Sequence, residues 1–144
     1  MKANKPNATK RVSEMTGHRL RPFPTVYQRP ARIISPDDTE YDSKAEAAWG
    51  ALLKLRKHAG DIVEYWPHGM KLMLAKGDFY TPDFLVQFAE HLEIHEVKGY
   101  MREDAREKLK IAVRKFYTIK FVVLWATWDK RKKRHAFREE VWSP

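Results

Sequence analysis

The chain has 144 residues and no cysteine, and its 28 lysines and arginines against 19 acidic residues give a formal net charge of +9. This length fits one domain with a substantial core, and the 43% share of hydrophobic residues excludes a wholly disordered chain. The lack of cysteine excludes disulfides, thiolate catalysis and cysteine zinc sites. No apolar run approaches the roughly 20 residues needed to cross a bilayer, and the first ten residues lack the apolar region of a signal peptide. We therefore expect a cytoplasmic protein without membrane contact.

The surplus positive charge lies at the two ends of the chain. Residues 1–32 hold eight basic residues and one acid, residues 129–144 hold six and three, and the stretch between them holds 14 and 15. We therefore divide the chain into a basic, proline-containing N-terminal arm (1–40), a core (41–128) and a basic C-terminal segment (129–144). Basic ends suit sequence-independent contact with nucleic-acid phosphates, and solvated tails that only keep a protein soluble would show the same charge.

The first regular element is predicted directly after the arm. The arm itself shows no sustained periodicity, and only residues 32–34 suggest a short edge strand. Ser43 followed by Glu46 fits a capping box, and the apolar residues that follow predict an amphipathic helix of about 16 residues. Gly60 is expected to end this helix in a left-handed conformation.

Alternating and continuous apolar runs predict five strands, at residues 62–66, 70–74, 84–88, 92–98 and 120–127. A turn is predicted at 76–78, after the second strand. An apolar stripe at helical spacing predicts a second helix at 102–117, between the last two strands. Such a strand–helix–strand unit implies a parallel crossover. The fold class is thus α/β, a mixed central sheet flanked by helices in the order α-β-β-β-β-α-β. A short final helix is predicted at 136–142.

Three charged side chains stand at the ends of neighbouring predicted strands. Asp83 precedes one strand, and Glu96 and Lys98 end the next on the face that also carries Ile94. Buried charges must be paired or bind a metal. A Glu–Lys pair alone could neutralise itself at the sheet margin, but Asp83 lies across the predicted hairpin, so two carboxylates can converge.

Converging carboxylates suit a hard divalent cation, which would hold a phosphodiester and lower the pKa of an attacking water. Lys98 would place a positive charge beside that water or the phosphate. Glu46 offers a third carboxylate from the first helix, although its role in the capping box needs no further function.

The order SKAE at a helix start, then TPDF, HEVKG and a helix containing REKLK resembles the PD-(D/E)XK nuclease superfamily. More narrowly, it resembles the small phage endonucleases of the endonuclease I, or Holliday-junction resolvase, type, over about residues 41–125. The resemblance implies a restriction-endonuclease-like core and an endodeoxyribonuclease that uses one or two Mg²⁺ or Mn²⁺ ions. It further implies that Glu46, Asp83, Glu96 and the backbone carbonyl of Val97 bind metal, and that Lys98 positions or activates the water.

The expected partner is DNA, branched or duplex, and the expected assembly is a homodimer, because junction resolution needs two coordinated cuts. No small organic cofactor is expected, and the compartment would be the host cytoplasm if the protein is phage-encoded. Tryptophans near the C-terminus could stack on bases or pack in a core, and the histidines show no metal-ligand spacing. The residues predicted to contact nucleic acid are Lys44, Arg102, Lys108, Lys110, Arg131, Lys132, Lys133 and Arg134.

Two other functions remain open at this stage. One is a non-catalytic, basic nucleic-acid-binding module that keeps a nuclease scaffold. The other is a transposase- or restriction-type nuclease subunit that needs a partner protein. The presence of Glu46, Asp83, Glu96 and Lys98 together favours an enzyme, because a retired nuclease would be expected to lose at least one of them.

Overall fold

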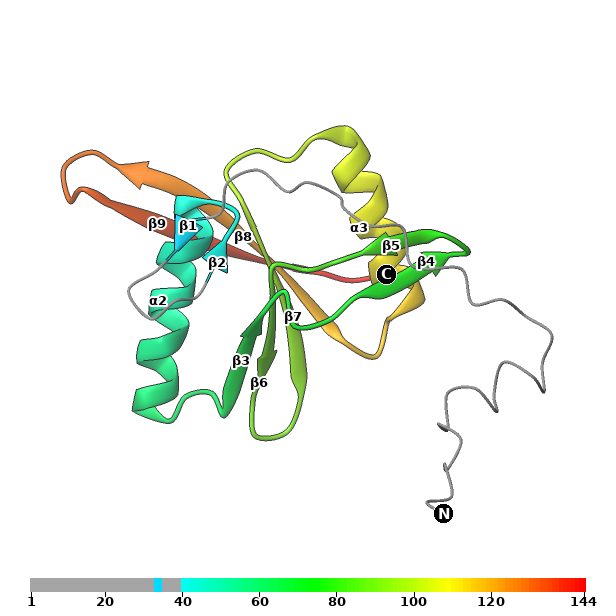
Figure 1. The fold of residues 1–144 in the computed structure, drawn as a ribbon, viewed down its shortest axis with the longest axis horizontal. Helices are drawn as coiled ribbons and strands as arrows, with labels where there is room; N and C mark the ends of the chain where they lie inside the picture. Colours follow the sequence, from blue (N-terminus) through cyan, green and yellow to red (C-terminus); the bar gives the residue numbers. More distant parts are fainter. Residues whose placement is uncertain (1–32, 35–39) are drawn as a thin grey trace, which may run out of the picture.

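A computed structural model describes residues 33–34 and 40–144 of the chain (Figure 1). The rest of the predicted N-terminal arm lies outside the described residues. The elements in chain order are β1 (Ile33–Ile34), β2 (Glu40–Tyr41), α2 (Lys44–Ala59), β3 (Glu64–Pro67), β4 (Leu72–Ala75), β5 (Asp78–Tyr80), β6 (Phe84–Gln87), β7 (Leu92–Lys98), α3 (Glu103–Lys115), β8 (Lys120–Asp129) and β9 (Arg134–Trp142).

The main sheet has five strands in the order β3-β6-β7-β8-β9. The β7–β8 pair, which α3 connects, is parallel, and the other three pairs are antiparallel. Two further pairs, β1–β2 and β4–β5, form separate two-stranded sheets. The prediction of a mixed α/β fold with helices beside a mixed sheet is therefore confirmed.

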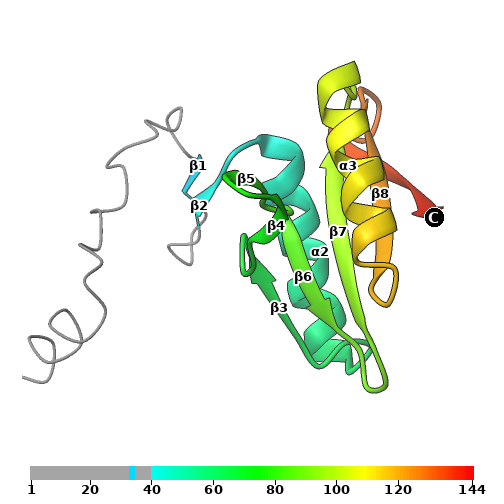
Figure 2. The ribbon, with the colours of Figure 1, turned by 90° about the vertical axis from the view of Figure 1, so that its right-hand side faces the viewer.

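The two faces of the main sheet are covered by different elements (Figures 1 and 2). On one face, α2 buries Trp49 and Leu53 against β6, β7 and β8. On the other face, α3 and the β4–β5 hairpin pack over β7 and β8. The interior strand β8 alternates between the two cores, with Phe121 facing α3 and Val122 facing α2. This alternation explains why its sequence is continuously apolar.

The first helix begins and ends as its sequence predicts. The Ser43 hydroxyl oxygen accepts a hydrogen bond from the Glu46 backbone N–H at 3.1 Å, which satisfies one of the unpaired donors of the first turn. At the other end Gly60 adopts φ +84°, where a residue with a Cβ would be strained. Neither helix in the described part of the chain is long and apolar enough to span a membrane.

The prediction of a helix at 136–142 is wrong, because these residues belong to strand β9. β9 pairs antiparallel with β8 from Phe121↔Trp142 to Asp129↔Arg134. The Asp129 carboxylate accepts the backbone N–H groups of Arg131 and Lys132 at 2.9 and 3.0 Å, which shapes the hairpin turn. Pairing with the otherwise open edge of β8 satisfies the backbone of this segment, and that long-range gain outweighs its local helix propensity.

Two smaller differences concern the strands before the site. The predicted turn at 76–78 is shorter, since Asp78 already belongs to β5, a three-residue strand that the sequence did not reveal. Strand β3 lies two residues later than predicted at its start and includes Pro67, which an edge strand tolerates. Ile62, which precedes β3, is nevertheless buried in the core under α2.

A buried polar chain ties α2 to the central strand β7. The indole N–H of Trp49 donates to Nδ1 of His95 at 3.2 Å, and an indole nitrogen can only donate. His95 therefore carries its proton on Nε2 and donates to Glu93 at 2.9 Å. Lys120 and His91 bond the other Glu93 oxygen at 2.7 and 2.8 Å. His95, 2% exposed, thus has a structural role on the α2 face of the sheet.

The electrostatic surroundings of Glu93 predict how stability depends on pH. Burial opposes its ionisation, but hydrogen bonds from His95, Lys120 and His91 outweigh burial and lower its pKa to about 2. The folded-state pKa lies below the unfolded value near 4.5, so the charged carboxylate contributes stability above pH 4.5 that is lost as pH falls towards 2.

We expect Glu93→Gln to lower the free energy of unfolding by on the order of 1–3 kcal/mol at pH 6, with the difference shrinking as pH approaches 2.5. Urea unfolding at several pH values measures both quantities. Glu90→Gln, on the exposed turn before β7, serves as the control and should change little. A pH-independent difference between Glu93→Gln and the unsubstituted chain would contradict the assigned environment of Glu93.

Candidate metal centre

Asp83 and Glu96 meet where the β6–β7 pair ends. Phe84 pairs with His95 in the sheet, so the residues just beyond, Asp83 and Glu96, stand opposite each other. Oδ2 of Asp83 accepts the backbone N–H of Val97 at 2.7 Å, and Oε2 of Glu96 accepts the backbone N–H of Asp83 at 3.4 Å. The two strands thus hold both carboxylates at one end of the sheet, as the sequence predicted.

Lys98 joins the two carboxylates from the same strand. Its Nζ lies 2.7 Å from Oε1 of Glu96 and 3.7 Å from Oδ2 of Asp83. Burial disfavours the charged ammonium, but attraction to Glu96 and Asp83 outweighs burial and raises the pKa of Lys98 above its ordinary value. Lys98 is therefore a fixed cation at neutral pH, able to stabilise negative charge or orient a water but not to accept a proton.

Glu46 adds a third carboxylate from the first turn of α2. Its Oε2 accepts the backbone N–H of Asp42, and its Oε1 accepts the Ser43 hydroxyl, both at 3.1 Å. Its charge raises the pKa values of both Asp83 and Lys98, which places it within electrostatic reach of the other three groups. The structure therefore brings Glu46, Asp83, Glu96 and Lys98 into one cluster.

This cluster buries more negative than positive charge. Glu46, Asp83 and Glu96 are 6, 8 and 7% exposed, and Lys98 is the one lysine paired with them among the described residues. Burial raises the pKa of Asp83 well above its ordinary value, and the Glu96 charge adds to this effect. Burial also raises the pKa of Glu46, despite its hydrogen bonds to Asp42 and Ser43. A divalent cation would compensate this charge, and carboxylate oxygens are its preferred ligands.

Two groups beside the cluster were not identified from the sequence. The Tyr80 hydroxyl donates to Oε2 of Glu96 at 2.6 Å from strand β5. Burial and the Glu96 charge raise the pKa of Tyr80, so it remains a donor. His68 follows β3, and its backbone N–H donates to the Asp83 carbonyl at 2.8 Å. Tyr80 directly precedes the TPDF motif and could have been found there, whereas no spacing in the sequence marks His68.

The other predicted site residues take different positions. The N–H of Val97 is used by Asp83, and a metal-ligand role for its carbonyl stays a prediction. Lys44 is exposed on the first turn of α2, two residues before Glu46. Arg102 pairs with Asp104 at 3.4 Å, Lys108 with Asp78 at 2.9 Å, and Lys110 with Glu107 at 2.7 Å. These three pairs reduce the positive charge that the α3 region can offer to a phosphate.

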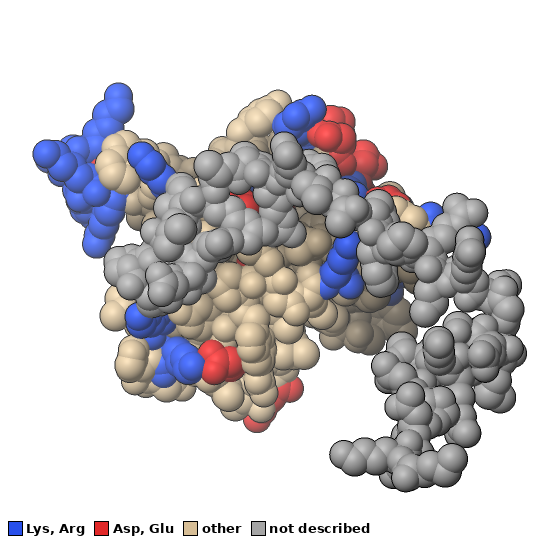
Figure 3. Space-filling model, in the orientation of Figure 1, with Lys and Arg blue, Asp and Glu red and all other residues tan. Residues whose placement is uncertain are grey.

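The remaining predicted phosphate contacts lie together at the turn of the β8–β9 hairpin. In Figure 1 this hairpin extends beyond the body of the fold, and Figure 3 shows a dense group of basic side chains at its tip. The four basic residues of the turn and the first residue of β9 are all exposed: Lys130, Arg131, Lys132, Lys133 and Arg134. Trp128, 51% exposed, packs edge-on against His135 beside them. We refer to residues 130–134 as the basic tip.

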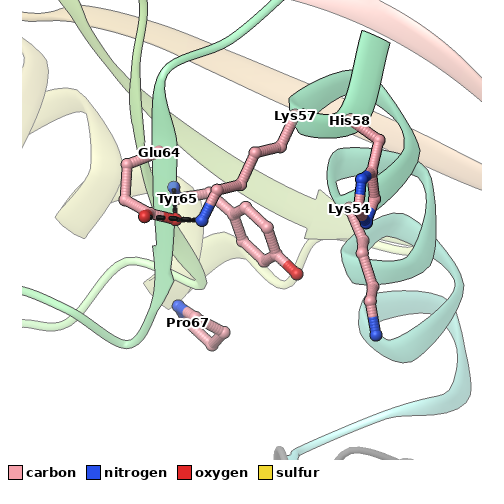
Figure 4. Close-up of a pocket in the computed structure, with 6 residues that line it drawn as sticks. All are labelled: Lys54, Lys57, His58, Glu64, Tyr65 and Pro67. Atoms are coloured by element: carbon pink, nitrogen blue, oxygen red, sulfur yellow. Dashed lines mark hydrogen bonds and ion pairs between the residues drawn. The ribbon is translucent and has the colours of Figure 1, made fainter. Parts of the chain in front are cut away.

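An open cavity of about 490 Å³ lies elsewhere, between α2 and β3 (Figure 4). Its residues are Lys54, Lys57, His58, Glu64, Tyr65 and Pro67. Figure 4 shows Lys57 reaching across to Glu64, whose two oxygens it contacts at 2.7 and 2.6 Å. With one carboxylate already paired to a lysine, this cavity lacks the excess negative charge that distinguishes the cluster at the end of β7.

Comparisons with models of protein families, with curated proteins and with solved structures found no match to this chain. The chemistry of the cluster and of the basic tip is therefore what indicates a function.

Proposed function

We propose that the protein is a metal-dependent endonuclease that hydrolyses phosphodiester bonds in DNA. The observation that carries this proposal is the cluster of three buried carboxylates, two of them paired with Lys98, where the start of β6 meets the end of β7. Such an arrangement is unfavourable without a cation and matches what phosphodiester hydrolysis needs. The motif resemblance of residues 41–125 to PD-(D/E)XK nucleases supports the same function.

In this proposal Mg²⁺ or Mn²⁺ is held by the carboxylates of Glu46, Asp83 and Glu96 and by the carbonyl of Val97. The ion would supply positive charge to the phosphate and to the attacking water. Lys98, whose pKa the neighbouring Glu96 and Asp83 charges raise, would stabilise the charge that develops on the phosphate. Tyr80 fixes the orientation of Glu96 through its 2.6 Å hydrogen bond.

Recognition of DNA would depend on a different part of the fold. The acidic cluster repels phosphates in the absence of metal, while the basic tip offers five exposed cations. Neutralised phosphates release condensed counterions, so such contacts give affinity without sequence preference. We therefore infer that the β8–β9 hairpin holds the DNA backbone, and branched DNA is the substrate that the motif resemblance favours.

We expect Glu96→Gln and Lys98→Met to reduce cleavage by at least about 10²-fold while DNA binding is retained. Both substitutions keep the approximate size of the side chain, and the amide oxygen introduced by Glu96→Gln can still accept the hydrogen bond from Tyr80. The assay uses junction, flap, duplex and single-stranded DNA with Mg²⁺ or Mn²⁺, and EDTA as the metal-free control. If the unsubstituted protein leaves all four substrates uncut both with Mg²⁺ and with Mn²⁺, the proposed function is wrong.

Metal binding should also raise the melting temperature, Tm, of the protein. At a metal concentration about 100-fold above Kd, the linkage free energy is near 2.7 kcal/mol, and we expect Tm to rise by roughly 5–15 °C. Glu96→Gln should show a Tm without metal that is equal or higher, because a repelling buried charge is removed, and a smaller rise with metal. Glu90→Gln should respond like the unsubstituted protein, and an equal rise in Glu96→Gln would exclude Glu96 as a ligand.

The role of the basic tip is tested by salt dependence. We expect Lys130→Gln/Arg131→Gln/Lys132→Gln to weaken DNA binding and to reduce the slope of log K against log salt by up to about 0.9 per lost phosphate contact. Fluorescence anisotropy at several salt concentrations measures the slope. Lys54→Gln/Lys71→Gln/Lys76→Gln removes the same charge from other exposed positions, so equal effects of the two triple variants would contradict a specific role of the tip.

A further inference from the structure

His68 has a buried nitrogen that the rest of the described protein does not use. Its side chain is 14% exposed, yet its Nε2 atom is buried and has no hydrogen-bond partner among the described residues. Leaving such a buried group unpaired is unfavourable. The backbone of His68 is also in the left-handed region, at φ +49°, which few residues with a Cβ adopt. The fold thus retains an unfavourable residue at this position.

The unpaired nitrogen faces two carboxylates. Nε2 of His68 lies 3.8 Å from Oε2 of Glu46 and 3.9 Å from Oδ2 of Asp42. These separations are too long for hydrogen bonds. One ligand atom from each of the three residues lies within 4.8 Å of the other two. Two ligand atoms that bind one ion at about 2.0–2.2 Å each can lie up to about 4.4 Å apart, so both separations from Nε2 are compatible with a shared divalent metal.

Two segments that are distant in sequence fix this geometry. Asp42 precedes α2 and gives its backbone N–H to Glu46, which lies in the first turn of α2. His68 lies between β3 and β4, and its backbone N–H is bonded to the Asp83 carbonyl. The imidazole is therefore positioned by the same residue whose carboxylate belongs to the neighbouring cluster. We refer to Asp42, Glu46 and His68 as the histidine triad.

We propose that the histidine triad is a second divalent-ion site, adjoining the cluster of Asp83 and Glu96, that selects Mn²⁺ or a similar transition-metal ion over Mg²⁺. The inference rests on the proposed metal-dependent function, because Glu46 belongs to both groups. Mg²⁺ requires oxygen ligands in near-ideal octahedral geometry, whereas an imidazole nitrogen suits the transition metals. A site with one imidazole and two carboxylates would thus bind Mn²⁺ more tightly than Mg²⁺.

The test measures Mn²⁺ binding to the full chain directly. Isothermal titration calorimetry gives the number and affinity of bound ions. Pulsed electron paramagnetic resonance detects magnetic coupling between Mn²⁺ and an imidazole ¹⁴N nucleus that binds it. His68→Gly removes the imidazole and suits the left-handed backbone, so it should fold. His68→Asn, which also tolerates that backbone, replaces the nitrogen with an oxygen ligand. His58→Ala removes an exposed histidine of α2 and is the control.

We expect the unsubstituted protein and His58→Ala to bind two Mn²⁺ ions, one of them coupled to ¹⁴N. In His68→Gly the coupling should vanish and one site should weaken by at least about 10-fold, while Mg²⁺ affinity changes by less than about 3-fold. In His68→Asn the coupling should also vanish, with a smaller loss of affinity. Circular dichroism confirms folding of each variant, and His68→Asn decides the question if His68→Gly does not fold.

An unchanged ¹⁴N coupling or an unchanged number and affinity of bound Mn²⁺ in both His68 variants would overturn the inference. So would a protein that binds Mn²⁺ without any ¹⁴N coupling, since His68 would then be only an electrostatic partner of the two carboxylates. Either result is compatible with DNA cleavage, so the nuclease function can survive it. Conversely, a ¹⁴N-coupled ion in a protein that cuts no DNA would uphold the triad and refute the proposed function.

Discussion

The structure depends on how three buried carboxylates are tolerated at one end of a sheet. Each carboxylate accepts a hydrogen bond from a group fixed by the fold. Asp83 accepts the Val97 backbone N–H, and Glu96 accepts the Tyr80 hydroxyl. Glu46 accepts the backbone N–H of Asp42, just before α2. These bonds and Lys98 offset part of the cost of burial, and the raised pKa of Asp83 shows that a part remains. An ionised carboxylate accepts several hydrogen bonds or metal bonds, so the cluster has acceptor capacity beyond these contacts. A bound metal ion, as proposed above, would offset the charge that Lys98 leaves uncompensated.

Strand β7 holds two carboxylates in different surroundings. Glu96 faces β5 and lies beside Asp83, whose pKa is raised well above its ordinary value by burial and by the Glu96 charge. Glu93 faces α2 and accepts bonds from His95, Lys120 and His91, which lower its pKa to about 2. The alternation of side chains across the strand therefore separates a stabilising network from a centre suited to chemistry. The stable face anchors the strand, and this rigidity fixes the position of the carboxylate on the other face.

The predictable parts of this protein were those decided by local sequence. The capping residue Ser43 and the left-handed Gly60 mark both ends of α2, and the period-two pattern of residues 92–98 gives the bounds of β7. The convergence of Asp83 and Glu96 followed from a short hairpin. Strand β9 was missed because its pairing with β8 is a tertiary effect that its own composition opposes. His68 was missed for a similar reason, since it reaches the carboxylates only through the path of the chain between β3 and β4.

In the proposed function, DNA binding and cleavage would depend on different parts of the fold, the basic tip and the acidic cluster. Exposed charges separated by more than about 8 Å are screened at physiological ionic strength, whereas buried charges are screened much less. The five exposed cations of the tip would therefore lose attraction for DNA as salt rises, while the cluster beside Lys98 would keep its affinity for a metal ion. Salt would thus act mainly on the association with DNA, and metal mainly on the reaction. The stretch between the basic ends holds 14 basic and 15 acidic residues. It is nearly neutral and adds little net attraction for DNA.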